Sequence, residues 1–189
     1  MNSAEVPADV NLYERFLAGD TKAYDQLMIR HGDSLTLYLH GCLHDWQDAE
    51  DLMIEAFARI MVKRPKIHSG SFKAYLFKTG RNLAIRHYSR RSKIIRVSFE
   101  EAGSELAGSD LVEEKIAGDE QKKALYTCLD RIDPQQSEAL WLVYVAGMSY
   151  AEAAAVMKVN TKRVDHLLTR GKQSMKKELM KEGITSAYD

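Results

Sequence analysis

The sequence is poor in the residues that interrupt helices and in those that cross-link chains. It has three prolines, 11 glycines and two cysteines, Cys42 and Cys128, in 189 residues. So few helix breakers, with plentiful Leu, Ala, Met, Glu and Lys, favour an all-helical protein. Two cysteines do not make a disulfide framework, and we expect both to be buried apolar side chains.

Membrane and export signals are also missing from the sequence. No apolar run approaches the ~20 residues needed to cross a bilayer. The opening residues, MNSAEVPADVN, lack the basic-then-apolar pattern of a signal peptide. We therefore expect a cytoplasmic protein with no direct membrane insertion.

Recognisable catalytic and metal-binding patterns are absent as well. There is no Gly-rich phosphate loop, nucleophile elbow or metalloprotease motif. His40, Cys42 and His44 lie close together, but no further Cys or His pattern completes four metal ligands. We interpret these histidines as core or surface residues. We expect no enzyme activity, no catalytic residue, no metal and no cofactor.

What the sequence does have is strong charge segregation beneath a net charge of zero. Residues 1–58 carry 11 acids and three bases, residues 59–96 carry 12 bases and no acid, and residues 97–120 carry eight acids and one base. Aromatic residues interleave the basic block, at Phe72, Tyr75, Phe77 and Tyr88. Clustered Lys and Arg gain affinity for nucleic acid by releasing counterions, and unpaired bases stack on aromatic rings. The block therefore predicts nucleic-acid contact rather than a merely solvated helix face.

Hydrophobic periodicity predicts helices throughout the first half of the chain. The expected elements are a helix pair in 11–30 broken at Gly19-Asp20, an apolar helix over 35–43, a helix over 48–63, a loop over 65–70, and a helix from Ser71 to about Arg91. In the 48–63 helix, Asp48, Asp51 and Glu55 fall opposite the apolar face. In the following helix we expect Phe72, Leu76 and Leu83 to be mostly core.

The second half of the sequence predicts a linker and then a helix-turn-helix. Residues 97–118 are acidic and rich in Ser, Gly and Ala, which is a linker composition. A helix follows over 119–131, Asp133 and Pro134 open another, and Ser149 caps a third. The turn Lys158–Asn160 leads into a longer basic helix, the helix-turn-helix arrangement. The exposed candidates for DNA contact on that last helix are Thr161, Lys162, Arg163, Asp165, His166, Thr169 and Arg170.

Three segments in this order resemble a bacterial sigma factor of the extracytoplasmic-function type. They are DAEDLMIEAFARI, SFKAYLFKTGRNLAIRHYSRR and IDPQQSEALWLVYVAGMSYAEAAAVMKVN. The resemblance implies an all-α subunit that binds core RNA polymerase and recognises promoters. It implies an N-terminal tail (1–10), a region 2 domain (11–94), an acidic flexible linker (95–118), a region 4 helix-turn-helix domain (119–183) and a C-terminal tail (184–189).

The resemblance also assigns roles to particular residues. Asp48, Asp51 and Glu55 are expected to bind core polymerase, the last two at positions that contact the clamp coiled coil of its largest subunit. The residues expected to bind and melt the minus-ten element are Lys66, Ile67, His68, Lys73, Tyr75, Lys78, Asn82, Leu83, Arg86, His87, Arg90 and Arg91. The candidates on the last helix are expected to read the minus-thirty-five element. An anti-sigma factor is a further expected partner.

Several positions depart from the pattern of that family. Ile54 stands where Gln is usual, Tyr75 where Trp is common, and Arg86 where many members have Asp. Asp165 and Leu167 replace basic or polar residues, and Gly171 replaces Ala. The changes at Tyr75 and Arg86 predict altered base preference rather than lost binding, and Asp165 is a candidate to read cytosine N4. Two alternatives remain at this point: a free-standing helix-turn-helix regulator, and an adaptor that binds only proteins.

Overall fold

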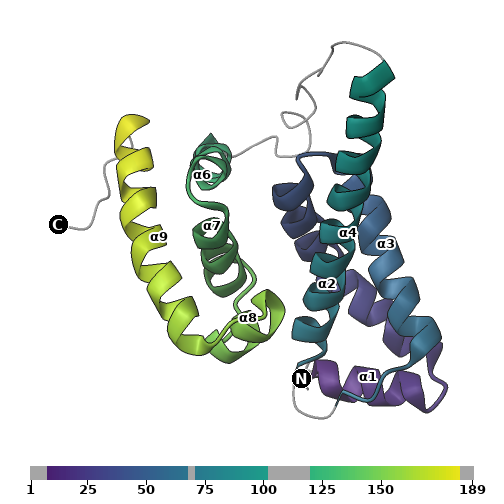
Figure 1. Ribbon diagram of the computed structural model, residues 1–189. Helices are drawn as coiled ribbons and strands as arrows, with labels where there is room; N and C mark the ends of the chain where they lie inside the picture. The colour runs from purple at the N-terminus through teal and green to yellow at the C-terminus, as the bar shows by residue number, and fades with distance from the viewer. Residues whose placement is uncertain (1–7, 68–70, 102–119, 184–189) are drawn as a thin grey trace. The chain divides into compact units, whose positions relative to one another are not determined.

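The computed structural model describes residues 8–67, 71–101 and 120–183, and side chains up to residue 90 and from residue 124 onward within those ranges. The chain divides into two compact units, Met1–Ala107 and Gly108–Asp189 (Figure 1). Every regular element in the described residues is helical, with no strand. The prediction of an all-α fold with two helical domains is confirmed. None of the described helices is long and apolar enough to span a bilayer.

Four helices build the first unit: α1 (Asp9–Leu17), α2 (Thr21–Leu43), α3 (Trp46–Lys63) and α4 (Phe72–Glu101). Asp20 caps α2 and Ser71 caps α4, because each side-chain oxygen accepts a hydrogen bond from a backbone N–H three residues on, at 3.3 and 3.0 Å. In Figure 1, α4 packs along α2 and α3, with α1 across one end.

An aromatic cluster holds these four helices together. Its rings have centroids 4.5 to 6.5 Å apart, within the range of favourable aromatic pairs. The cluster consists of Tyr13, Phe16, Tyr24, Phe57 and Phe72. The buried Tyr24 hydroxyl donates to the Phe57 carbonyl at 2.5 Å, and burial raises the pKa of this tyrosine. The predicted core residues Phe72, Leu76 and Leu83 are buried.

Helix α2 is one helix where the sequence predicted two. His31 and Gly32 lie in its middle and are buried, and His31 Nε2 lies 2.6 Å from the Asp9 carboxylate on α1. Packing against neighbouring helices outweighs the roughly 1 kcal/mol that glycine costs inside a helix. Gly80 of α4 has a similar role, because a Cβ there would lie 3.0 Å from Leu35 Cδ1 on α2. The glycine allows α2 and α4 to approach closely.

Helix α4 extends to Glu101, well beyond the predicted end near Arg91. No glycine or proline lies between Gly80 and Gly103, so the sequence offers no strong stop signal before Glu101. The rest of the predicted linker, 102–118, and both predicted tails apart from 8–10 lie outside the described residues.

The second unit contains α6 (Glu120–Arg131), α7 (Pro134–Leu140), a π-helical turn η1 (Trp141–Val145), α8 (Tyr150–Met157) and α9 (Thr161–Lys181). Asp133 caps α7, accepting from the backbone N–H groups of residues 135 and 136. Ser149 and Glu152 form a capping box at α8. Helices α8 and α9 with the turn between them form the predicted helix-turn-helix. The π-helical turn was not predicted.

Candidate nucleic-acid and partner interfaces

Two adjoining open grooves lie between α3 and α4, with volumes of about 180 and 340 Å³. They share Arg59, Leu83 and Arg86. The residues lining one or both grooves are Leu52, Glu55, Arg59, Ile60, Lys63, Tyr75, Thr79, Asn82, Leu83, Arg86, His87 and Arg90. Because α3 and α4 are packed against each other, side chains distant in sequence meet along one surface.

Half of the residues predicted to contact the minus-ten element line these grooves. They are Tyr75, Asn82, Leu83, Arg86, His87 and Arg90. Tyr75, Asn82, Arg86 and Arg90, together with Thr79, follow the three- and four-residue spacing that places side chains on one stripe of a helix. Leu83 is only 4% exposed, so it belongs to the core beneath the grooves as well as to their lining.

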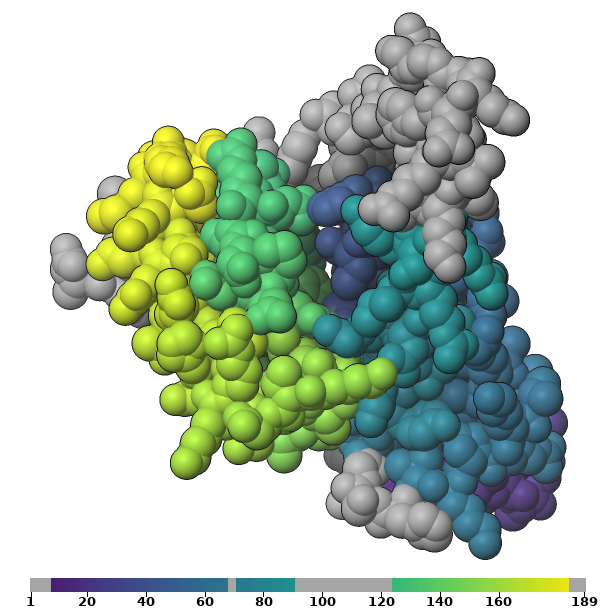
Figure 2. Space-filling model, viewed as in Figure 1, coloured from purple at the N-terminus to yellow at the C-terminus, as the bar shows by residue number. Residues whose placement is uncertain are grey.

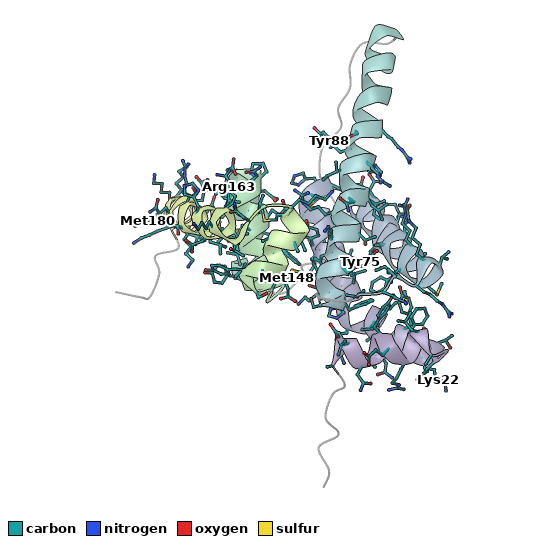
Figure 3. All side chains as sticks on the ribbon, turned by 60° about the horizontal axis from the view of Figure 1, so that its bottom comes forward. Lys22, Tyr75, Tyr88, Met148, Arg163 and Met180 are labelled. Carbon is teal, nitrogen blue, oxygen red and sulfur yellow. The ribbon has the colours of Figure 1, made fainter. Side chains whose placement is uncertain are left out.

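The other predicted minus-ten residues lie outside the two grooves. Lys66 and Ile67 lie in the segment after α3, which is tied to α1 because the Tyr13 hydroxyl donates to the Pro65 carbonyl at 2.8 Å. Lys73 and Lys78 of α4 are half-buried and line neither groove. His68 and the side chain of Arg91 lie outside the described residues. Tyr75 lies in the first turns of α4, and Tyr88 projects from its exposed side (Figure 3).

Two basic groove residues, Arg59 and Lys63 of α3, were missing from the predicted set. With Arg86 and Arg90 they make four Lys or Arg side chains, against one carboxylate, that of Glu55. In the part of the chain that the structure describes, Lys63, Arg86 and Arg90 have no ion-pair partner. The grooves therefore carry unbalanced positive charge, which favours an anionic ligand.

The three acids predicted to bind polymerase do not form a single outward patch. Asp51 is exposed, and Glu55 accepts two hydrogen bonds from Arg59 at 2.6 and 2.9 Å. The Asp48 carboxylate instead lies 3.1 Å from His87 Nε2 on α4. A residue predicted to contact polymerase thus pairs with one predicted to contact DNA. Beside the acids, Ile54 is 55% exposed.

In the second unit, all the predicted minus-thirty-five residues are exposed on α9. Helix α9 forms the yellow to yellow-green strip of the second unit in Figure 2, and Arg163 lies near the first turn of the helix (Figure 3). Arg163 Nη2 donates to Gln135 Oε1 of α7 at 2.9 Å. Asn160 caps α9, and Val164 and Leu168 hold the helix in the unit's core.

Two family departures on α9 have a packing explanation. Leu167 is 3% exposed, so it faces the core and not a ligand. At Gly171 a Cβ would lie 3.0 Å from Leu140 Cδ1 and 3.1 Å from Leu140 Cγ. The glycine allows α9 to approach α7 closely, and Ser174 Oγ donates to Gln136 Oε1 at 2.9 Å along the same interface between the helices.

His40, Cys42 and His44 do not form a candidate metal site among the described residues. His40 stacks on Trp46 with ring centroids 4.1 Å apart, and burial, followed by the nearby His44, lowers the pKa of its imidazole. Cys128 is buried as predicted, but the prediction that Cys42 is buried is wrong. Burial along α2 ends at Leu39, so Cys42 lies in a last turn that extends beyond the core. Within the described ranges, no three His, Cys, Asp or Glu side chains are placed to hold a metal ion.

Comparison with known proteins agrees with this arrangement. The sequence matches the family models of Sigma-70 region 2 over residues 27–94 and of Sigma-70, region 4 over residues 122–175. It is 27% identical over 166 residues to the ECF RNA polymerase sigma factor SigE of Mycolicibacterium smegmatis, covering 87% of this chain and 65% of SigE. It is 27% identical over 172 residues to the ECF RNA polymerase sigma factor BldN of Streptomyces coelicolor, covering 88% of this chain and 64% of BldN. The chain thus spans slightly less than two thirds of the length of each of these relatives.

A solved structure shares the fold. It is the sigma factor RpoE in complex with the anti-sigma factor NepR from Bartonella quintana, with a TM-score of 0.70, 21% identity, and coverage of 84% of this chain and 98% of that one. The grooved helical unit and the helix-turn-helix unit correspond to the two matched sigma-70 regions. This chain belongs to the extracytoplasmic-function group of the sigma-70 family.

Proposed function

We propose that this protein is a transcription initiation factor that binds core RNA polymerase in the cytoplasm and directs it to specific promoters. The observation that carries the proposal is the paired arrangement of α3 and α4. One side of this pair is a groove lined by Arg, Lys, Tyr and Asn, while α3 also presents Asp51 and Glu55 to solvent. A factor that links polymerase to DNA needs such adjacent surfaces.

In this proposal the α3–α4 groove takes one strand of the melted minus-ten element. Cations compensate the backbone phosphates, and Tyr75 and Asn82 offer a stacking face and an amide for bases. Base capture offsets the few kcal/mol that unstacking costs, so melting requires no chemical step by the protein. The chain acts by binding and not as an enzyme.

The second unit is proposed to read the minus-thirty-five element. The exposed side chains of α9 include Arg163 and Lys162, which can donate to guanine, and Asp165, which can accept from cytosine N4. A protruding helix of this kind fits the major groove of duplex DNA. In this proposal the two units read separate elements of one promoter.

An anti-sigma factor is the proposed regulatory partner. The similar RpoE structure contains the anti-sigma factor NepR, which motivates the same class of partner here. On this chain the exposed Asp51 and Ile54 of α3 are surfaces that such a protein would cover in competition with polymerase.

The deciding experiment is a titration of labelled protein with bacterial core RNA polymerase. We expect nanomolar affinity, and a loss of at least tenfold in an Asp51→Lys, Glu55→Lys variant, because both carboxylates become cations. Lys22→Glu, a charge reversal on the exposed start of α2, is the control. Absence of core binding by the wild type, with tight binding of duplex operator DNA, would instead indicate a free-standing helix-turn-helix regulator.

A further inference from the structure

Arg59 lies where the acidic surface of α3 meets the basic grooves. It lines both grooves, and its Nε and Nη2 atoms donate to the same oxygen, Glu55 Oε1, at 2.9 and 2.6 Å. Glu55 itself lines the larger groove. One residue pair therefore connects the surface proposed for polymerase with the surface proposed for DNA.

The pair is well suited to being opened by a competing anion. The side chains of Arg59 and Glu55 are 37% and 43% exposed. An ion pair with this exposure, between residues one helical turn apart, favours the paired over the separated side chains by only about twofold. A guanidinium has five N–H donors in a fork that matches phosphate as well as carboxylate. Glu55 occupies one edge of that fork, the edge formed by Nε and Nη2.

The surroundings of Arg59 favour a phosphate over the carboxylate. Lys63 lies one turn further along α3, and Arg86 reaches the same two grooves from α4. Neither has an ion-pair partner among the described residues. A phosphate beside Arg59 would gain from these cations too, whereas Glu55 is fixed one turn away on α3.

We propose that Arg59 is a nucleic-acid-binding residue of the α3–α4 groove, and that Glu55 is its internal competitor, holding the guanidinium edge that a backbone phosphate would take. The identity of the ligand as a DNA strand rests on the function proposed above. Glu55 then has two effects: it presents a carboxylate to polymerase, and it weakens DNA binding by the free chain.

The test measures binding of the full chain to a short fluorescent single-stranded oligodeoxynucleotide by anisotropy, at several salt concentrations. We expect Arg59→Gln to lower affinity about three- to tenfold at low salt. It should also reduce the magnitude of the log–log salt slope by about 0.7, because the variant neutralises one phosphate fewer than the wild type. Glu55→Gln should raise affinity about two- to fivefold. Adding Glu55→Gln to Arg59→Gln should recover less than twofold, because the competitor has no guanidinium left to occupy.

Arg15 and Asp20 provide matched controls. They form another exposed ion pair of the same unit, with the same closest distance of 2.6 Å, but neither lines either of the two α3–α4 grooves. Arg15→Gln and Asp20→Asn remove the same charges, and asparagine keeps the capping function of Asp20. Each control should change oligonucleotide affinity by less than about twofold, the long-range effect of one charge.

Three results would overturn the proposal. One is an Arg59→Gln variant that binds as the wild type does. Another is a Glu55→Gln variant with unchanged or weaker binding. The third is no oligonucleotide binding at low salt by either the wild type or Glu55→Gln. Core-dependent, promoter-specific transcription by the wild type tests the proposed function separately, so failure of one claim is distinguishable from failure of the other.

Discussion

The two helical units present basic side chains to a ligand in different ways. In the first unit they come from two helices, α3 and α4, and line grooves that also contain Tyr75 and Asn82. In the second unit all the predicted readers come from one helix, α9, and each is exposed. A groove can surround a flexible strand, whereas a protruding helix enters the groove of a regular duplex.

The helix packing explains this difference. In the first unit α3 and α4 lie side by side for much of their length, so their facing edges form a shared surface. In the second unit α9 is anchored through Val164, Leu167, Leu168 and Gly171, which leaves the opposite face exposed. Similar residue types thus suit different nucleic-acid shapes, because tertiary packing decides whether they surround a ligand or project toward it.

Charge reversal in each unit should test whether the first unit prefers single-stranded DNA and the second prefers duplex DNA. We expect Arg86→Glu with Arg90→Glu to lower single-strand affinity about 100-fold, because two cations proposed to contact phosphates become anions. Duplex binding should fall far less. Arg163→Glu should show the opposite pattern, with a loss of about tenfold on a minus-thirty-five duplex. Anisotropy titrations of both variants with both ligands check this. Equal losses on the two ligands in both variants would contradict the division of roles.

A second contrast concerns the glycines at helix crossings, Gly80 in the first unit and Gly171 in the second. Valine at either position should destabilise its unit by about 2 kcal/mol through overpacking. Substitution by alanine should cost different amounts of stability at the two sites. At Gly80 the only contact near 3.0 Å is a Leu35 methyl group, which can rotate away. At Gly171 the added methyl would also meet Leu140 Cγ at 3.1 Å and Gln136 Cβ at 3.3 Å, which move less easily.

We therefore expect Gly171→Ala to cost about 1 kcal/mol more than Gly80→Ala, where the helix preference for alanine offsets much of the crowding. The chain has two tryptophans, Trp46 in the first unit and Trp141 in the second. Urea unfolding followed in Trp141→Phe and Trp46→Phe backgrounds reports each unit separately. A larger loss at Gly80 than at Gly171 would mean that Leu35 is held more rigidly than its contacts indicate.

Local signals in the sequence predicted most of the fold. Asp20, Ser71, Asp133 and Ser149 each cap a helix at a start that the sequence predicted, because capping depends on only a few neighbouring residues. Errors arose where tertiary contacts decide. The central part of α2 is helical because His31 and Gly32 are packed, and Cys42 is exposed because the core ends before the helix does.

The candidate sites were predicted less completely, for a related reason. A stripe such as Tyr75, Asn82 and Arg86 can be derived from the helical period alone. The groove also needs the facing edge of α3, and no periodicity specifies which edge of one helix faces another. Arg59 and Lys63 begin the acid-free run of the sequence, a signal that could have identified them. The roles of individual residues at both sites remain predictions.

The smallest predicted effect concerns how the stability of each unit depends on acid pH, and here too the two units should differ. The buried His31 and Thr36 both lie in the first unit. His31 Nε2 and Arg30 Nη1 each lie 2.6 Å from the Asp9 carboxylate. Burial alone would raise the pKa of Asp9, but the hydrogen bonds from His31 and Arg30 outweigh it and lower the pKa below its usual value.

A carboxylate with a lowered pKa stabilises the folded state above its unfolded pKa, near 3.9, and loses that contribution as the pH falls through the folded value. Asp9→Asn should therefore destabilise the first unit by about 1 kcal/mol at pH 7, and the difference from the wild type should shrink below about pH 4. Urea unfolding at several pH values, in the Trp141→Phe background, measures this. The second unit, followed through Trp141 in the Trp46→Phe background, is the control and should show no effect of the substitution. A difference that stays constant or widens toward acid pH would mean that the Asp9 carboxylate does not stabilise α1 against α2 through its charge.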